Sequence, residues 1–247
     1  MNDFNADLFD EIKFAKKHFD FFELTLEENL LKYNTNYVNR LKKTFGKFKV
    51  LGHIHWGIKF SKNSQKEIQA AIKSIKIFKK LEAKKVTIHP SWEEGNQKEL
   101  VENNLLKIKR INKCCILAGI QLMIENIQRP PFNKARQLKD FTTKIPKSKI
   151  TFDTGHASKV SKFQITKFLM LADRIEHIHL HDRVNKLDHL EFKDKKKLKK
   201  LIKKIKNSGY NKTITFEIYR TLKDSKSVPL GYKKRRTILL QHLNEIT

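Results

Sequence analysis

Three histidines alternate with apolar residues in one short stretch, Ile175 to Asp182, which reads Ile-Glu-His-Ile-His-Leu-His-Asp. In an extended strand alternate side chains share a face, so His177, His179 and His181 would point to one side and the apolar residues to the other. Neutral imidazole is a common ligand of Zn, Mn and Fe, and three histidines in a row are unusual for a dry core. Taken alone, the stretch fits either a metal-binding strand or half-exposed histidines at a strand end.

Strand patterns and helix patterns alternate along the chain. Strands are expected at residues 19–24, 49–55, 85–89, 120–126, 149–153, 175–182 and 213–217. Helices are expected at residues 27–41, 97–118, 134–142, 161–171, 192–208 and 228–243, and from a cap at Ser64 to about residue 79. The alternation predicts the α/β class, as a single (β/α)8 TIM-type barrel domain over residues 1–247. Its first strand is not evident, so either residues 1–4 form a stub of it or the barrel is open there.

Polar residues of one kind end most of these expected strands. Six of the seven end in an imidazole or a carboxylate: His53 or His55, His89, Glu125, Asp153 with His156, His179, and Glu217. The C-terminal strand ends of a (β/α)8 barrel converge on one mouth, where the active sites of that fold lie. Any one of these residues could be an ordinary cap or strand-end residue. As a set they predict a cluster of nitrogen and oxygen donors of the kind that binds Zn or Mn.

Six motifs follow one another in the sequence. They are His53-Ile54-His55-Trp56, Val86-Thr87-Ile88-His89-Pro90, Ile124-Glu125-Asn126, Asp153-Thr154-Gly155-His156-Ala157, the histidine strand, and Ile214-Thr215-Phe216-Glu217. In this order they resemble the motifs of the xylose-isomerase-like TIM barrels, which include sugar phosphate isomerases and epimerases and endonuclease IV. The motif at Asp153 matches the family pattern letter for letter, whereas His55 stands where the family usually has proline.

The resemblance implies a site that binds a divalent metal, Zn or Mn. Its ligands would be Glu125, Asp153, His179 and Glu217. As in the epimerases of the family, Glu125 and Glu217 would also move the proton α to a sugar carbonyl, and His156 would orient the substrate. Trp56 and Asn126 become candidate substrate contacts, and so does Arg183, through a phosphate. The expected activity is therefore that of a sugar or sugar-phosphate isomerase or epimerase.

The endonuclease IV branch of the same resemblance implies a different activity, metal-dependent phosphodiester cleavage at abasic DNA. In that branch His53 and His89 would hold a second ion together with Glu125, and His156 and His189 would hold a third. The site would therefore bind one to three ions. Against this reading, Asp188 directly precedes His189, and the family's glycine-rich loop is replaced by residues 190–194. Either the third site is lost or Asp188 reaches it from a shifted loop. His177 and His181 stay open as further ligands, and a barrel that only binds its ligand is a third possibility.

Composition sets the remaining expectations. A net charge of +27 makes polyanions, including nucleic acid, candidate partners, but only nine of the 53 basic residues are arginine, and surface lysines are ordinarily solvated. Cys114 and Cys115 are adjacent in an expected helix and cannot easily bridge, which suggests a reducing compartment. No leader pattern and no membrane-length apolar run is evident, so we expect a cytoplasmic protein. Its oligomeric state is not indicated.

Overall fold

The computed structural model describes residues 7–27, 29–60, 65–223 and 226–246. The strand stub considered at residues 1–4 and the helix cap expected at Ser64 lie outside these residues. The chain divides into two compact units, the first made of Met1–Glu125, Arg129–Pro131 and Lys139–Lys149, the second of Asn126–Gln128, Phe132–Leu138 and Ile150–Thr247. Each unit has its own parallel strands, and the expectation of a single domain stays a prediction.

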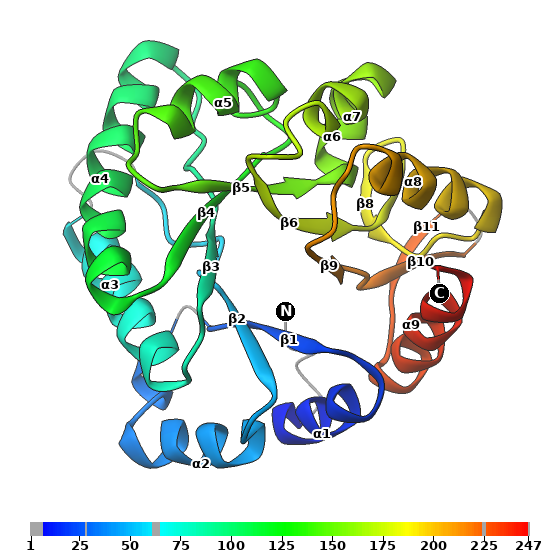
Figure 1. Cartoon of the computed structure of the whole chain (residues 1–247), viewed down its shortest axis with the longest axis horizontal. Helices are drawn as coiled ribbons and strands as arrows, with labels where there is room; N and C mark the ends of the chain where they lie inside the picture. The colour runs from blue at the N-terminus through cyan, green and yellow to red at the C-terminus, as the bar shows by residue number, and fades with distance from the viewer. Residues whose placement is uncertain (1–6, 28, 61–64, 224–225, 247) are drawn as a thin grey trace. The chain divides into compact units, whose positions relative to one another are not determined.

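The first unit contains parallel strands that pair with one another in the order of the sequence. Within its described residues these are β1 (Phe21–Thr25), β2 (Lys49–His53), β3 (Lys85–Ile88) and β4 (Gln121–Glu125). Its helices α1 (Leu8–His18), α2 (Thr35–Phe45), α3 (Gln65–Lys80) and α4 (Gln97–Ala118) alternate with these strands, and α2 to α4 lie along one face of them (Figure 1). This is the expected alternation of strand and helix.

The helix expected at residues 27–41 is wrong in its first half. A short 3-10 helix, η1 (Leu30–Lys32), precedes α2. Asn34 then begins α2, because its side-chain oxygen accepts a hydrogen bond from the N–H of Tyr37 at 2.9 Å. Helix α1, which was not expected, starts in the same way, with the Asp7 carboxylate accepting from the N–H of Phe9.

The second unit has parallel strands β5 (Lys149–Asp153), β6 (Ile175–Leu180) and β9 (Thr213–Phe216), of which only Lys149 is assigned to the first unit. Its helices are α6 (Thr154–Val160), α7 (Lys162–Leu169), α8 (Lys195–Asn207) and α9 (Tyr232–Ile246), while α5 (Ala135–Thr143) is divided between the units. A further sheet, in the order β11-β10-β8-β7, was not expected. Its strands are β7 (Asp182–Val184), β8 (Leu187–Leu190), β10 (Arg220–Lys223) and β11 (Lys226–Pro229).

One helix of the second unit was not expected, and another begins later than expected. The helix expected at residues 161–171 is present as α7, and the unexpected α6 precedes it, with Ser161 extended between the two at φ −173°. Helix α6 begins directly after β5, where the Asp153 carboxylate caps it by accepting from the N–H of His156 at 2.6 Å. The last helix begins at Tyr232 and not at Val228, because residues 226–229 pair with β10.

Helix ends and faces explain the segments that were expected correctly. Asn96 caps α4 by accepting from the N–H groups of Lys98 and Glu99, and Gly119 ends it with a left-handed φ of 70°. Helix α8 buries Leu198, Ile202 and Ile205 at helical spacing, each contributing about 1.5–3 kcal/mol, while its lysines face solvent. Among the helices of the described residues, none is long and apolar enough to cross a bilayer.

Candidate metal site

His53, His89 and Glu125 come together at the strand ends of the first unit. Nε2 of His53 lies 3.3 Å and Nε2 of His89 2.8 Å from the same carboxylate oxygen, Oε2 of Glu125, which is fully buried. His53, and not His55, is the member of this group: the ring of His55 instead stacks on Trp56, which is 52% exposed. The exposed Trp56 could contact a substrate, and that assignment stays a prediction.

The hydrogen-bond partners of His53 show why this group of three residues suits a cation. Its Nδ1 lies 2.9 Å from the carbonyl oxygen of Ile54, which can only accept, so Nδ1 carries the hydrogen. In the neutral ring Nε2 is then a lone pair that faces the Glu125 carboxylate. Two acceptors in a buried place require a proton or a metal ion between them. A histidine whose second nitrogen donates to a backbone carbonyl is the usual arrangement of a metal ligand.

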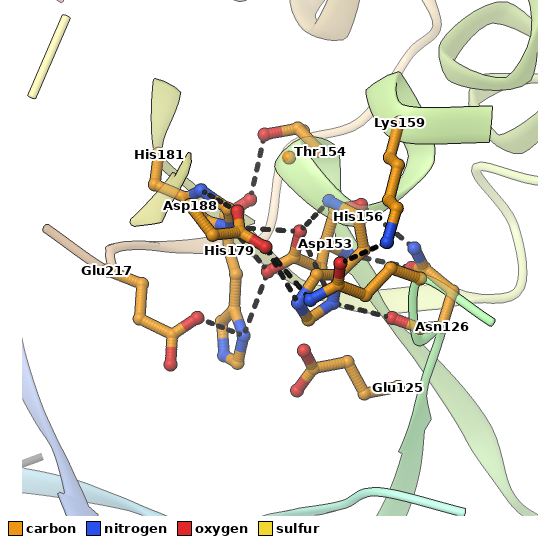
Figure 2. Close-up of polar contacts among 12 residues, drawn as sticks. Glu125, Asn126, Asp153, Thr154, His156, Lys159, His179, His181, Asp188 and Glu217 are labelled. Carbon is orange, nitrogen blue, oxygen red and sulfur yellow. Dashed lines mark hydrogen bonds and ion pairs between the residues drawn. The ribbon is translucent and has the colours of Figure 1, made fainter. Parts of the chain in front are cut away.

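The second unit brings Asp153, His179 and Glu217 together. Nδ1 of His179 lies 3.3 Å from Oε2 of Glu217 and 4.0 Å from Oδ2 of Asp153. His179 and Asp153 are fully buried, whereas the Glu217 side chain is 14% exposed. Figure 2 shows the three side chains converging from strand ends. One imidazole and two carboxylates are a donor set suited to Zn or Mn, so these residues fit a divalent ion.

A second cluster in the same unit contains His156, His181 and His189, each offering a ring nitrogen within 4.8 Å of the others. Asp188 does reach this cluster: its Oδ1 lies 3.2 Å from Nδ1 of His181 and its Oδ2 3.9 Å from Nε2 of His156. His156 directs Nδ1 at the carbonyl of Asn126, 2.9 Å away, which leaves Nε2 as a lone pair. His189 adopts an unusual positive φ of 53°, a conformation that in non-glycine residues is concentrated at functional sites.

The cluster shifts the pKa values of its histidines in opposite directions. Burial alone would lower the pKa of His181, but the charges of Asp153 and Asp188 outweigh it and raise the pKa above the ordinary value. Burial lowers the pKa of His189, and Glu217 only partly opposes this. Without a metal ion, His181 is therefore the histidine of this pair that more readily carries a positive charge.

Other predicted residues have protein partners. The Asn126 side chain donates to the carbonyl of Asp153 at 2.9 Å and accepts from its N–H at 2.8 Å. The Arg183 side chain is 5% exposed, and its Nη1 lies 2.5 Å from Oδ2 of Asp188 and 3.3 Å from Oε1 of Gln128. The substrate contacts predicted for Asn126 and Arg183 stay predictions. His177, considered as a further ligand, is fully buried and hydrogen-bonded to Thr213 Oγ1 at 2.8 Å.

Sequence reasoning considered His181 only as a possible further ligand and gave Gly155 no role in the site. A Cβ atom on Gly155 would lie 1.9 Å from Cε1 of His181, so the histidine ring fills space that only glycine leaves. The available signal was the glycine after the strand-ending Asp153, together with the third histidine of the histidine strand. Cys115 offers no competing nucleophile, because burial raises the pKa of its thiol to about 12 and keeps it protonated.

Comparison with solved structures supports the fold. The chain is 20% identical to a D-tagatose 3-epimerase-like protein, with a TM-score of 0.73 over 95% of this chain and 92% of that one. It is 14% identical to D-psicose 3-epimerase from Clostridium cellulolyticum H10, with a TM-score of 0.75 over 98% and 93%. For 3-keto-D-glucoside 4-epimerase from E. coli the identity is 10% and the TM-score 0.75, over 98% and 97%.

Comparison with sequences gives the family. An uncharacterized protein of Methanocaldococcus jannaschii is 32% identical over 114 residues, a match that covers 44% of this chain and 44% of that protein. The family model described as xylose isomerase-like TIM barrel matches residues 12–237. This match confirms the α/β TIM-type barrel expected from the alternating strands and helices. The chain belongs to the xylose isomerase-like TIM barrel family.

Proposed function

We propose that the protein is a divalent-metal-dependent isomerase or epimerase of sugars or sugar phosphates. The observation that carries the proposal is the donor set of the second unit, in which His179 Nδ1 lies 3.3 Å from Glu217 and 4.0 Å from Asp153. Glu125 is proposed as the fourth ligand from its place in the family motif Ile124-Glu125-Asn126 at the end of β4. The mixture of nitrogen and oxygen donors suits Zn or Mn.

Each proposed residue has a chemical task. When bound, the ion would polarise the substrate carbonyl and so make the proton on the neighbouring carbon more acidic. Glu217 is suited to take that proton, because its carboxylate lies at the strand end and is 14% exposed, so a substrate can reach it. Glu125 would return a proton, and His156 would orient the sugar through its Nε2. A general base must lie within hydrogen-bond reach of the proton it moves, which places the sugar carbon against Glu217.

The substrate class rests on the structural relatives. Solved structures of similar fold include D-psicose 3-epimerase with D-tagatose and D-allulose 3-epimerase with D-allulose. We therefore propose a ketose or ketose phosphate as substrate. The free cysteines, Cys114 and Cys115, are compatible with a reducing compartment, and we propose the cytoplasm.

A second candidate function, phosphodiester cleavage at abasic DNA, is favoured by one specific observation. His53 and His89 both face Oε2 of Glu125, an arrangement that a single ion at Asp153, His179 and Glu217 does not require. A further ion at this position would suit hydrolysis, in which clustered metals activate water and stabilise the leaving oxygen. The net charge of +27 is compatible with DNA as substrate.

Metal content and product analysis test the proposal together. Protein purified without added ions is analysed for Zn and Mn, and then incubated with a panel of ketoses and, separately, with a duplex that contains an abasic site. About one ion per chain with formation of an epimer supports the proposal. Two or three ions with cleavage of the duplex, sensitive to salt, would support hydrolysis instead. A metal-loaded protein that leaves every ketose unchanged would refute the proposal for the sugars tested.

A further inference from the structure

His181 lies between two carboxylates just beyond the end of β6. It is 2% exposed, and its Nε2 lies 3.1 Å from Oδ1 and 3.0 Å from Oδ2 of Asp153. On the other side of the ring, Nδ1 lies 3.2 Å from Oδ1 of Asp188 (Figure 2). One ring nitrogen thus contacts both oxygens of Asp153, so rotation of that carboxylate would weaken both contacts.

The direction of the hydrogen bond to Asp153 follows from the carboxylate. Its two oxygens accept, so the contacts at 3.1 and 3.0 Å place a hydrogen on Nε2 of His181. On the other side of the ring, Nδ1 lies 3.2 Å from the carbonyl oxygen of Asp182 and 3.2 Å from the backbone nitrogen of His189. His181 therefore donates to the carboxylate of Asp153 through Nε2.

Packing holds the ring in this place. A Cβ atom on Gly155 would lie 1.9 Å from Cε1 and 2.4 Å from Nδ1 of His181, so the ring rests directly on the backbone of α6. The same helix begins at Asp153, whose Oδ1 accepts from the N–H of His156 at 2.6 Å. Asp153, His181 and the first turn of α6 therefore form one packed arrangement, in which the orientation of the carboxylate is determined on both sides.

His177, on the same strand, shows what an ordinary buried histidine does here. It is fully buried, and its Nδ1 lies 2.8 Å from a neutral hydroxyl, Thr213 Oγ1. His181 is equally buried, but its two nitrogens face Asp153 and Asp188. Burying carboxylates is costly unless they are hydrogen-bonded, and a ligand carboxylate must also keep lone pairs directed at the metal. The contacts of His181 meet both needs.

We propose that His181 is a positioning residue, which orients the carboxylate of Asp153 for a divalent cation without binding the cation itself. This inference rests on the proposed function, because it needs Asp153 to be a metal ligand. Residues that hold a metal ligand in place typically change metal affinity about 10–100-fold when they are removed. The role thus predicts a change in the dissociation constant of the metal and no change in the number of ions bound.

The test measures Co²⁺ binding to the whole chain by visible absorption and by calorimetry. His181→Leu keeps a side chain of moderate size but removes the donor, and we expect its dissociation constant for Co²⁺ to rise about 10–100-fold at unchanged stoichiometry. His181→Gln keeps an N–H that can reach Asp153, and we expect it to restore most of the affinity. Circular dichroism and thermal unfolding establish that each variant is folded before binding is compared.

A glycine pair provides a second test that leaves His181 in the chain. Gly155→Ala forces the ring away from its place, and we expect weaker Co²⁺ binding in the same direction as His181→Leu. Gly231→Ala is the matched control, because a Cβ atom there would meet nothing within 4 Å, and we expect no change. This comparison keeps the inference testable if His181→Leu does not fold.

Each outcome separates the inference from the proposed function. If the wild-type chain binds no divalent metal, the proposed function fails and the inference fails with it. If the wild type binds Co²⁺ and His181→Leu or Gly155→Ala binds it equally well, the inference alone is overturned. Loss of one whole equivalent of Co²⁺ in His181→Leu would show that His181 is a ligand, which also overturns the positioning role.

Discussion

Replacing Asn126 with leucine should destabilise the second unit strongly, because the amide of Asn126 binds both backbone groups of Asp153. Its Nδ2 donates to the Asp153 carbonyl at 2.9 Å, its Oδ1 accepts from the Asp153 N–H at 2.8 Å, and the residue is fully buried. Leucine has a similar size but no polar atom, so both hydrogen bonds to the Asp153 backbone are lost. Each such loss costs about 1–3 kcal/mol, so we expect a decrease of about 3 kcal/mol in the free energy of unfolding.

Thermal unfolding followed by circular dichroism measures this loss. For a chain of this length about 3 kcal/mol corresponds to a fall in Tm of about 6–12 °C. Asn112→Leu is a control that removes one buried hydrogen bond, to the carbonyl of Pro146 at 2.8 Å, and should cost about half as much. Asn207→Ala, at an exposed position, should change stability by less than about 0.5 kcal/mol. Unchanged unfolding of Asn126→Leu together with a raised KM would refute this reasoning and support the predicted substrate contact.

Three further variants test the site. Glu217→Gln should abolish activity and weaken metal binding while the fold stays intact, because it removes one negative charge from the metal ligands at nearly constant shape. A variant with wild-type metal content and wild-type rate would contradict this. In an isomerase, His189→Ala should raise KM or modestly lower kcat without loss of metal, whereas loss of one metal equivalent would favour the hydrolase. Burial lowers the pKa of His242 below its ordinary value of 6.5. The unfolded chain therefore takes up a proton more readily than the folded one, so the free energy of unfolding should fall as the pH drops below about 6.5. This fall should be smaller in His242→Gln, and urea unfolding measured across pH tests the difference.

Local signals in the sequence were sufficient for several elements. Helix α4 was expected with its observed ends, because Gly119 supplies a C-terminal cap and the segment has helical character throughout. Strand β5 was likewise expected at Lys149–Asp153, since its run of β-branched and aromatic residues ends sharply at a carboxylate. The strand-end positions of Asp153, His179 and Glu217 followed from the same patterns, and the structure brings these residues together within the second unit.

Long-range contacts explain what the sequence could not show. Strands β7 and β8 are short and contain charged residues, so their pairing depends on contacts that no local pattern reveals. The two hydrogen bonds of Asn126 join residues 27 positions apart, and the sequence alone made it a candidate substrate contact. The contacts of His181 depend on the space left by Gly155, which becomes visible only when both residues are placed.

Exchange of the proton next to the sugar carbonyl tests the central claim most directly. The metal-loaded protein is incubated in D₂O with D-psicose and with D-tagatose, and the sugars are examined by NMR. The proposed proton transfer predicts that deuterium enters at the carbon next to the carbonyl, and that this exchange is lost after chelation and in Glu217→Gln. Binding of both metal and ketose without any deuterium incorporation would contradict the assignment of the protein as an isomerase or epimerase.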